Sequence, residues 1–172
     1  MSFEAIKATV LDVVTGHMVL AEPAVMAMGF IEGIPVLSLF VPSSVLFLGI
    51  GTAHAAAGGN FWQLWLFAAT GAMASDVLMY ALGRIYKSHT LRIWPLSRHP
   101  DWWHKGHDVL VRWGAVAVLG GKFMGPFRPA IPTVSGVLMM PLWKFLPASL
   151  ASSLIWAGTL LGPGYGLKWL AD

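Results

Sequence analysis

Long apolar blocks with almost no charge are the feature that most restricts how this sequence can fold. The last of them runs from Phe145 to Leu167 without a charged residue. Of the 172 residues, 56% are hydrophobic and 11% are charged, whereas about 25% of the residues in an ordinary soluble domain are charged. Because a helix that crosses a bilayer needs about 20 apolar residues, these blocks predict an all-α integral membrane protein.

The composition also argues against other classes of function. The chain has no cysteine, which excludes disulfides and thiolate chemistry. Its formal net charge of +3 is not gathered into a basic arm or an aromatic-lined groove, so we expect a membrane surface as partner and no nucleic acid. No Ser–His–Asp order, glycine-rich phosphate loop or metalloprotease pattern appears, so we expect neither enzymatic activity nor a cofactor.

The apolar blocks are of two kinds. Residues 61–86 and 141–169 are long enough to cross the bilayer as single helices. In residues 22–60 and 113–140, glycine and proline divide the apolar sequence into two arms of about ten residues, the length of a re-entrant hairpin. We predict two such hairpins; the alternative is that proline and glycine kink ordinary membrane spans.

Two further segments complete a single membrane domain over residues 1–172. Residues 1–21 carry apolar side chains at helical spacing and predict an amphipathic helix along the membrane interface. Residues 87–112 are polar, and six of the eleven basic residues lie in or next to them. The positive-inside bias therefore predicts a cytoplasmic loop there, with both ends of the chain outside. The six are Arg84, Lys87, Arg92, Arg98, Lys105 and Arg112.

The order hairpin, span, loop, hairpin, span indicates an internal duplication. Pro42 follows Glu32 by ten residues, and Pro132 follows Lys122 by ten residues. A hairpin returns to its own face of the membrane whereas a span changes face, so the two units must enter from opposite sides, as in the inverted repeats of transporters. After each proline, a small hydroxyl residue is expected to cap the returning arm. The expected tip residues are Pro42, Ser43, Ser44, Pro132 and Thr133.

Four ionisable residues lie inside the apolar blocks: Glu32, Asp76, Lys122 and Arg128. Each costs at least ~2.5 kcal/mol at bilayer depth if it faces lipid, so each must face a protein interior, a partner or water. One hypothesis is that the acids and bases form ion pairs that hold the hairpins together. The other is that Arg128 and Lys122 bind an anion, with Arg128 gripping phosphate bidentately. The acids would then supply a titratable partner, and Glu32 is suited to a proton relay.

The histidines are weaker candidates for function. His99, His104 and His107 have some resemblance to metal-ligand spacing. The two tryptophans before His104 favour an interfacial helix instead. We therefore expect no metal site.

Three segments together resemble one known family. They are "FIEGIPVLSLFVPSSVLFLGIG", "GAMASDVLMYALGR" and "GKFMGPFRPAIPTVSGVLMMPLWKF", and a W-x-G to GY-G ending follows them. The second segment is similar to the family motif G-x-x-x-G-D-x-x-x-Y-x-x-G-R. On these segments, which span most of residues 23–169, the sequence resembles the DedA family, also called the SNARE-associated or VTT-domain family.

The resemblance implies two re-entrant hairpins and, for bacterial members, movement of lipid-linked phosphates driven by the proton-motive force, notably recycling of undecaprenyl phosphate. Eukaryotic relatives are lipid scramblases, and many members have a further span after the matched region. Glu32 and Arg128 match an acid and an arginine of the family, and Asp76 matches its helix aspartate. By gapless alignment, Ser44 stands where the family has a second acid at the hairpin tip. Lys122 stands where it has a further arginine.

These observations lead to a hypothesis about function. We expect a flippase of the cytoplasmic membrane that binds the phosphate head of undecaprenyl phosphate or a phospholipid at Arg128 and Lys122, with proton coupling or ion pairing at Glu32 and Asp76. Two alternatives stay open: a proton-coupled antiporter of small ions or drugs that uses the two acids, and a structural membrane factor for the cell envelope. The expected partners are membrane lipids, the phosphate-headed substrate and protons, and a homo-oligomer is left open.

Overall fold

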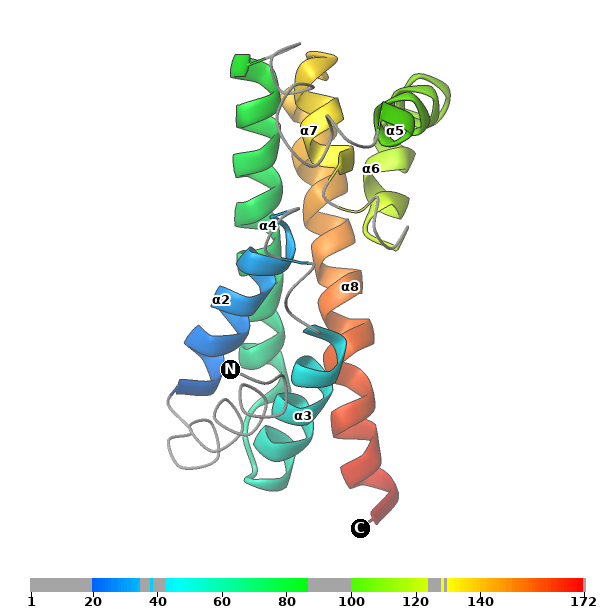
Figure 1. Cartoon of the computed structure of the whole chain (residues 1–172). Coiled ribbons are helices and arrows are strands. Elements are labelled where there is room, and N and C mark those ends of the chain that lie inside the picture. Colours follow the sequence, from blue (N-terminus) through cyan, green and yellow to red (C-terminus); the bar gives the residue numbers. More distant parts are fainter. Residues whose placement is uncertain are drawn as a thin grey trace.

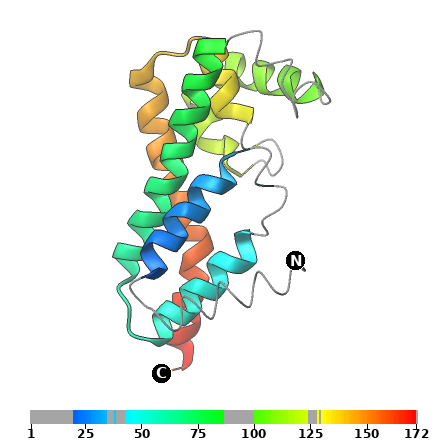
Figure 2. The same cartoon turned by 60° about the vertical axis from the view of Figure 1, so that its left-hand side comes forward.

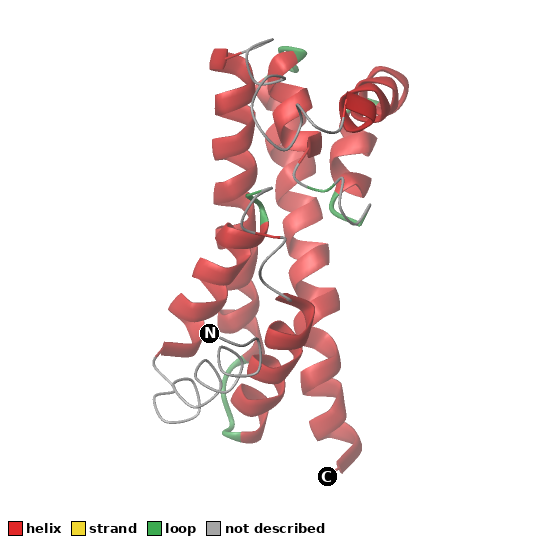
Figure 3. Cartoon of the chain, viewed as in Figure 1, coloured by secondary structure: helices red, strands yellow, loops and turns green. Residues whose placement is uncertain are grey.

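A computed structural model of the chain describes residues 20–34, 38, 43–86, 100–123, 128 and 130–171, with the side chains of 43, 100–106 and 167–171 excepted. These residues form seven helices and no strand, in agreement with the predicted all-α class (Figure 3). The helices are α2 (Ala21–Glu32), α3 (Ser43–Ala56), α4 (Phe61–Tyr86), α5 (Pro100–Trp113), α6 (Ala115–Gly121), α7 (Ala130–Val137) and α8 (Leu142–Ala171). The amphipathic helix predicted at 1–21 lies almost wholly outside the described residues.

Two long helices form the axis of the molecule. α4 and α8 run side by side in opposite directions over most of its height (Figures 1 and 2). α4 has 26 residues, and α8 contains a candidate span of 25 residues, Leu142–Gly166. At about 1.5 Å of rise per residue, each is longer than the roughly 30 Å hydrocarbon core of a bilayer. Both coincide with the spans predicted at 61–86 and 141–169.

The outward faces of α4 and α8 are apolar. In the most apolar part of each helix, 44% of the residues are buried inside the protein, so more than half are at least partly exposed. The large exposed side chains include Leu66, Val77 and Leu78 on α4 and Leu150 and Ile155 on α8. Many large apolar side chains exposed on long helices are costly in water and suit contact with lipid.

Shorter helices cover the two long ones. α2 packs along α4 and α3 along α8 in the lower half of Figure 1, whereas α6 packs against α8 and α7 against α4 in the upper half. The contact between α7 and α4 is close. A Cβ atom placed on Gly136 would lie 2.0 Å from the carbonyl oxygen of Tyr80, and one on Gly83 would lie 2.1 Å from that of Thr133. Small residues permit this close approach of helix backbones in membranes.

Replacing Gly136 by alanine is therefore expected to destabilise the protein, because the new methyl group would overlap the backbone of α4. We expect a loss of about 1–3 kcal/mol in the free energy of unfolding, measured by denaturant titration of the purified protein in mixed micelles. Gly120 is the matched control, since a Cβ atom there meets no heavy atom within 4 Å. Gly120→Ala should be neutral or slightly stabilising, and equal stability of the two variants would contradict the close packing.

The start of α7 differs from the sequence prediction. Pro132 and Thr133, which were expected at a hairpin tip, are the third and fourth residues of α7 and are buried. Thr133 therefore does not cap the helix. The reason is that proline is tolerated in the first turn of a helix, where its missing N–H has no partner to lose. The helix consequently begins before the proline instead of after it.

The loop predicted at 87–112 is also helical in part. α5 occupies its second half, in keeping with the interfacial helix that the tryptophans there favoured. Leu110 of α5 is 6% exposed and belongs to the core that α6 and α7 share, whereas the charged residues Asp108 and Arg112 are exposed. This one-sided apolar pattern explains why a polar segment forms a helix. Residues 87–99 lie outside the described residues.

The hydrophobic core is divided into two clusters, one at each end of the long helices. One cluster joins α2, α3, the first half of α4 and the second half of α8, and it includes Phe47, Leu64 and Trp156. The other joins Tyr80 of α4 and Phe145 of α8 to α5, α6 and α7. The stretch of α4 and α8 between these two cores carries buried polar side chains.

Candidate functional site

A layer of buried polar residues separates the two apolar cores. Ser75 and Asp76 of α4 and Ser149, Ser152 and Ser153 of α8 are each no more than 4% exposed. The hydroxyl of Ser152 donates a hydrogen bond to the carbonyl oxygen of residue 119 in α6 at 2.8 Å, which ties α6 to α8. Buried polar groups in native proteins are almost always hydrogen-bonded. These hydrogen-bonded residues therefore form a polar layer inside the fold, near the middle of both long helices.

Lys122 forms a buried ion pair with Asp76 in this layer. Its Nζ atom lies 2.6 Å from Oδ2 of Asp76, and the two side chains are 3% and 6% exposed. The hydroxyl of Ser149 donates to the same carboxylate oxygen at 2.7 Å, and Nζ also lies 3.4 Å from the carbonyl oxygen of Ala72. A buried ion pair is tolerated when further hydrogen bonds satisfy its members. This pair joins the end of α6 to both long helices.

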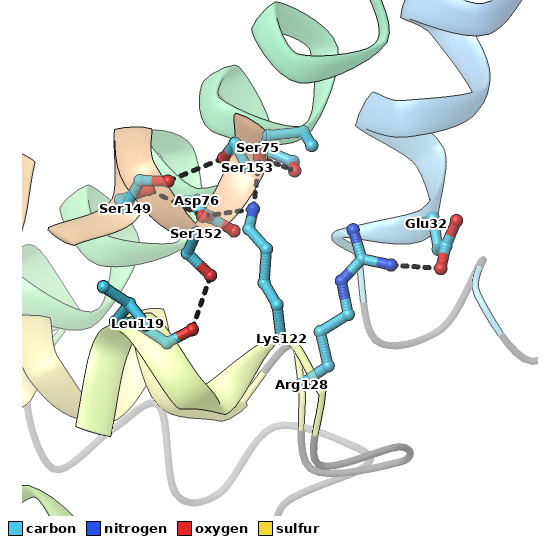
Figure 4. A network of polar contacts seen from close by, with 10 residues as sticks. Glu32, Ser75, Asp76, Leu119, Lys122, Arg128, Ser149, Ser152 and Ser153 are labelled. Atoms are coloured by element: carbon cyan, nitrogen blue, oxygen red, sulfur yellow. Dashed lines mark hydrogen bonds and ion pairs between the residues drawn. The ribbon is translucent and has the colours of Figure 1, made fainter. Parts of the chain in front are cut away.

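Arg128 forms the second ion pair, with Glu32. Its Nη1 atom donates a hydrogen bond to Oε1 of Glu32, and the two side chains are 6% and 14% exposed. In Figure 4, Lys122 and Arg128 extend from the connection between α6 and α7, Lys122 toward Asp76 and Arg128 toward Glu32 at the end of α2. The tertiary structure therefore brings all four intramembrane ionisable residues into one region, as two acid–base pairs.

The remaining surroundings of Arg128 leave part of its guanidinium unused. Its Cζ atom lies 4.1 Å from the centroid of the Trp156 ring, within the range of a cation–π interaction. Its Nε and Nη2 atoms are buried and have no hydrogen-bond partner in the part of the chain that the structure describes. Leaving a buried donor of a charged group unsatisfied costs at least about 1–3 kcal/mol. Arg128 therefore holds donors that its protein neighbours do not satisfy.

Helix ends place the charged residues in the layer. α2 ends at Glu32, and a Cβ atom on the next residue, Gly33, would lie 1.9 Å from Oγ of Ser75. The chain thus turns directly against the polar part of α4, which only glycine permits. Lys122 likewise follows the last residue of α6. Because these positions lie where helices stop, the side chains can reach inward between the long helices.

The other residues predicted for the site are placed as follows. Pro42 lies outside the described residues, and Ser43 is the first residue of α3, with its side chain outside them. Ser44 is exposed in the first turn of α3. Pro132 and Thr133 are buried in α7, which packs against α4.

Sequence reasoning did not single out the residues that complete the layer. Ser149, Ser152 and Ser153 occupy positions i, i+3 and i+4 on one side of α8, and Trp156 follows three residues later on the same side. This helical spacing was the available signal. The groups that these serines contact on α4 and α6 could not be predicted, because the hydrogen bonds join segments far apart in the chain.

One further polar contact lies outside the layer, in the core formed by α2, α3, α4 and α8. Nδ1 of His54 in α3 is 2.5 Å from the hydroxyl of Tyr165 in α8. Within the described residues, no group of three or more histidine or acidic side chains could hold a metal ion. His99 and the side chain of His104, considered above as metal ligands, lie outside those residues.

In the described residues, two long apolar helices carry exposed hydrocarbon side chains, and two acid–base pairs are buried in one region of the protein. These features are those of a helical membrane protein. The family model described as VTT domain matches residues 34–166, about three quarters of the chain. The protein therefore belongs to the VTT-domain family, which confirms the resemblance to the DedA family found in the sequence.

Curated relatives have names that agree with a membrane location. The chain is 29% identical over 141 residues to "Inner membrane protein YabI" of Escherichia coli (strain K12), covering 82% of this chain and 56% of the relative. It is 31% identical over 100 residues to "Inner membrane protein YohD" of the same organism, covering 58% of this chain and 51% of the relative. The chain spans about half the length of the first curated relatives it matches. No solved structure matches it.

Proposed function

We propose that this protein is a flippase that moves a phosphate-headed lipid, undecaprenyl phosphate or a phospholipid, across the cytoplasmic membrane. The observation that supports this most is Arg128, which is 6% exposed and has two buried N–H-bearing nitrogens without a hydrogen-bond partner among the described residues. A guanidinium can bind two oxygens of a phosphate through parallel hydrogen bonds. Lys122, which reaches the same layer, is a second cation beside this group (Figure 4).

The packing of the helices supports an inverted repeat of re-entrant hairpins. One unit consists of α2, α3 and α4, and the other of α6, α7 and α8. In each unit the first short helix packs on its own long helix, α2 on α4 and α6 on α8. The second short helix packs on the long helix of the other unit, α3 on α8 and α7 on α4. This exchange is expected when a pseudo-two-fold axis relates two units of opposite orientation, with substrate bound near the membrane midplane.

The charges of the layer favour proton coupling at Glu32. Two acids and two bases, when all are ionised, sum to zero formal charge. A phosphate that binds Arg128 adds negative charge to a buried region, which is costly at bilayer depth. Protonation of Glu32 would remove one negative charge from the layer and restore the balance, while its carboxyl can still accept the hydrogen bond from Arg128. Each inward-moving proton would then accompany one phosphate head, which links transport to the proton gradient.

The path of the lipid requires movement of the hairpins. Arg128 and Lys122 are both 6% exposed, so a phosphate head reaches them only after the short helices separate from α4 or α8. The hydrocarbon tail stays in the bilayer during this step, because the outward faces of the long helices are apolar. The transport cycle thus involves a lateral opening between a hairpin and a long helix.

The proposal is tested by reconstituting the purified protein into phosphatidylcholine vesicles that contain a tail-labelled fluorescent lipid. Movement between leaflets is followed by chemical quenching of the outer leaflet. We expect a labelled polyprenyl phosphate or phosphatidic acid to move faster with the protein than without it, whereas phosphate-free glucosylceramide should not be accelerated. Absence of acceleration for both phosphate lipids would overturn the proposed function.

The site assignment is tested in the same vesicles with Arg128→Lys, which keeps the charge but removes the forked donor pair. Loss of one charge-assisted hydrogen bond, worth about 1.5–3 kcal/mol, corresponds to a rate lower by roughly tenfold or more. Arg112→Lys is the matched control, because Arg112 is exposed on α5 outside the layer. Equal rates for the two variants would exclude Arg128 as the phosphate ligand.

A further inference from the structure

We propose that Trp156 is a positioning residue that fixes the plane of the Arg128 guanidinium and thereby directs its Nε–Nη2 edge at the lipid phosphate. This inference rests on the proposed function and adds to it the donor edge that binds and the side chain that orients it. Trp156 is 5% exposed and lies in α8, four residues beyond Ser152 on the same side of the helix.

The ring of Trp156 is itself held in place. It packs edge-to-face against Phe47 of α3, with ring centroids 5.2 Å apart and an angle of 81° between the planes. Both residues belong to the apolar core that α2, α3, α4 and α8 share. Aromatic pairs favour this edge-to-face geometry. The indole therefore presents a rigid surface at the boundary between this core and the polar layer.

The guanidinium lies over that surface, with Cζ 4.1 Å from the ring centroid. A guanidinium is planar, and its donors all lie in its plane. The ring at this distance limits the tilt of the guanidinium on one side, while the hydrogen bond from Nη1 to Glu32 fixes one of its ends. Together the two contacts restrict the orientation of the Arg128 guanidinium.

The two nitrogens of Arg128 that have no hydrogen-bond partner in the described residues, Nε and Nη2, are next to each other on the guanidinium. Nη1 is engaged by Glu32, whereas Nε and Nη2 have no partner in the described part of the protein. Nε and Nη2 form one side of the guanidinium, where two parallel N–H bonds can meet two oxygens of one phosphate. The geometry thus assigns separate edges of Arg128 to the resident acid and to the incoming phosphate, so both can be bound together.

The role of Trp156 is tested by measuring how phosphatidic acid raises the melting temperature of the purified protein in detergent. For Trp156→Leu we expect the half-saturating concentration to rise about tenfold, since a desolvated cation–π contact contributes up to about 2 kcal/mol and 1.4 kcal/mol is tenfold in affinity. Trp156→Phe keeps an aromatic face and should stay close to the wild type. Trp143→Leu is the matched control, because Trp143 is 73% exposed on the same helix and contacts Lys144 through its ring.

A second comparison separates positioning from a merely structural role. In an Arg128→Lys background the forked edge is absent, so Trp156→Leu should raise the half-saturating concentration little further. An equal rise in both backgrounds, or an unchanged value in Trp156→Leu alone, would overturn the role of Trp156. If phosphatidic acid does not stabilise even the wild type, the phosphate site of the proposed function fails instead. The two failures are therefore distinguishable.

Discussion

Asp76→Ala is expected to lower the free energy of unfolding by about 3–5 kcal/mol, the loss typical of removing one member of a buried ion pair. The variant would leave Lys122, whose side chain is 3% exposed, without its carboxylate at 2.6 Å. The hydroxyl of Ser149 would lose its acceptor as well. Reversible denaturant titration in mixed micelles, followed by helix content, measures the loss.

We expect the stability lost in Asp76→Ala to be recovered by a second substitution at Lys122. Most of the loss arises because a buried cation is left unpaired, so removing that cation should recover stability. The double variant Asp76→Leu with Lys122→Met is therefore expected to be more stable than Asp76→Ala by most of that loss. The coupling energy follows from a double-mutant cycle in which Asp76→Leu and Lys122→Met are also measured as single variants. If the double variant is as unstable as the single one, the stability of this region does not depend on the pair.

Glu32→Gln is expected to abolish the stimulation of lipid transport by a proton gradient. The amide can still accept a hydrogen bond from Arg128, but it can take up no proton near neutral pH. Transport in the vesicle assay should become slow and independent of the gradient, because the neutral amide mimics protonated Glu32 permanently, so the phosphate is held without a proton step that promotes its release. The measurement is the leaflet-exchange rate with and without an imposed acidic exterior.

Glu22→Gln is the matched control for this experiment. Glu22 lies on the same helix in its first turn, away from the polar layer, and is half-buried. Its substitution should leave the response to the gradient unchanged. If Glu32→Gln retains the wild-type ratio of rates with and without the gradient, the coupling proton is not carried by Glu32. If wild-type transport itself ignores the gradient, the protein acts as an uncoupled scramblase.

The two sequence hypotheses for the intramembrane charges are compatible in this structure. Lys122 and Asp76 form a pair whose partners come from α6, α4 and α8, and this pair has the character of a structural tie. Arg128 and Glu32 form a pair in which the base keeps unsatisfied donors. The first pair therefore stabilises the layer, and in the second pair Arg128 keeps donors that are not used by its acid.

Local features of the sequence were sufficient for much of the fold. The spans at 61–86 and 141–169 follow from length and apolar composition, which require no knowledge of neighbours. The four ionisable residues stood out because charges are rare at bilayer depth. The predicted start of α7 was wrong because a proline such as Pro132 fits either the tip of a hairpin or the first turn of a helix.

Long-range packing decided the rest of the site. Glu32 and Arg128 are 96 positions apart, and nothing in their local sequence says that Arg128 faces Glu32 while Lys122 faces Asp76. The sequence also gives no sign that the ring of Trp156 in α8 contacts the guanidinium of Arg128. Composition and periodicity depend on each segment alone, so they identify which residues must be buried in a membrane protein. Which acid meets which base, and which donors are left for a ligand, depends on how α2, α4, α6 and α8 approach one another.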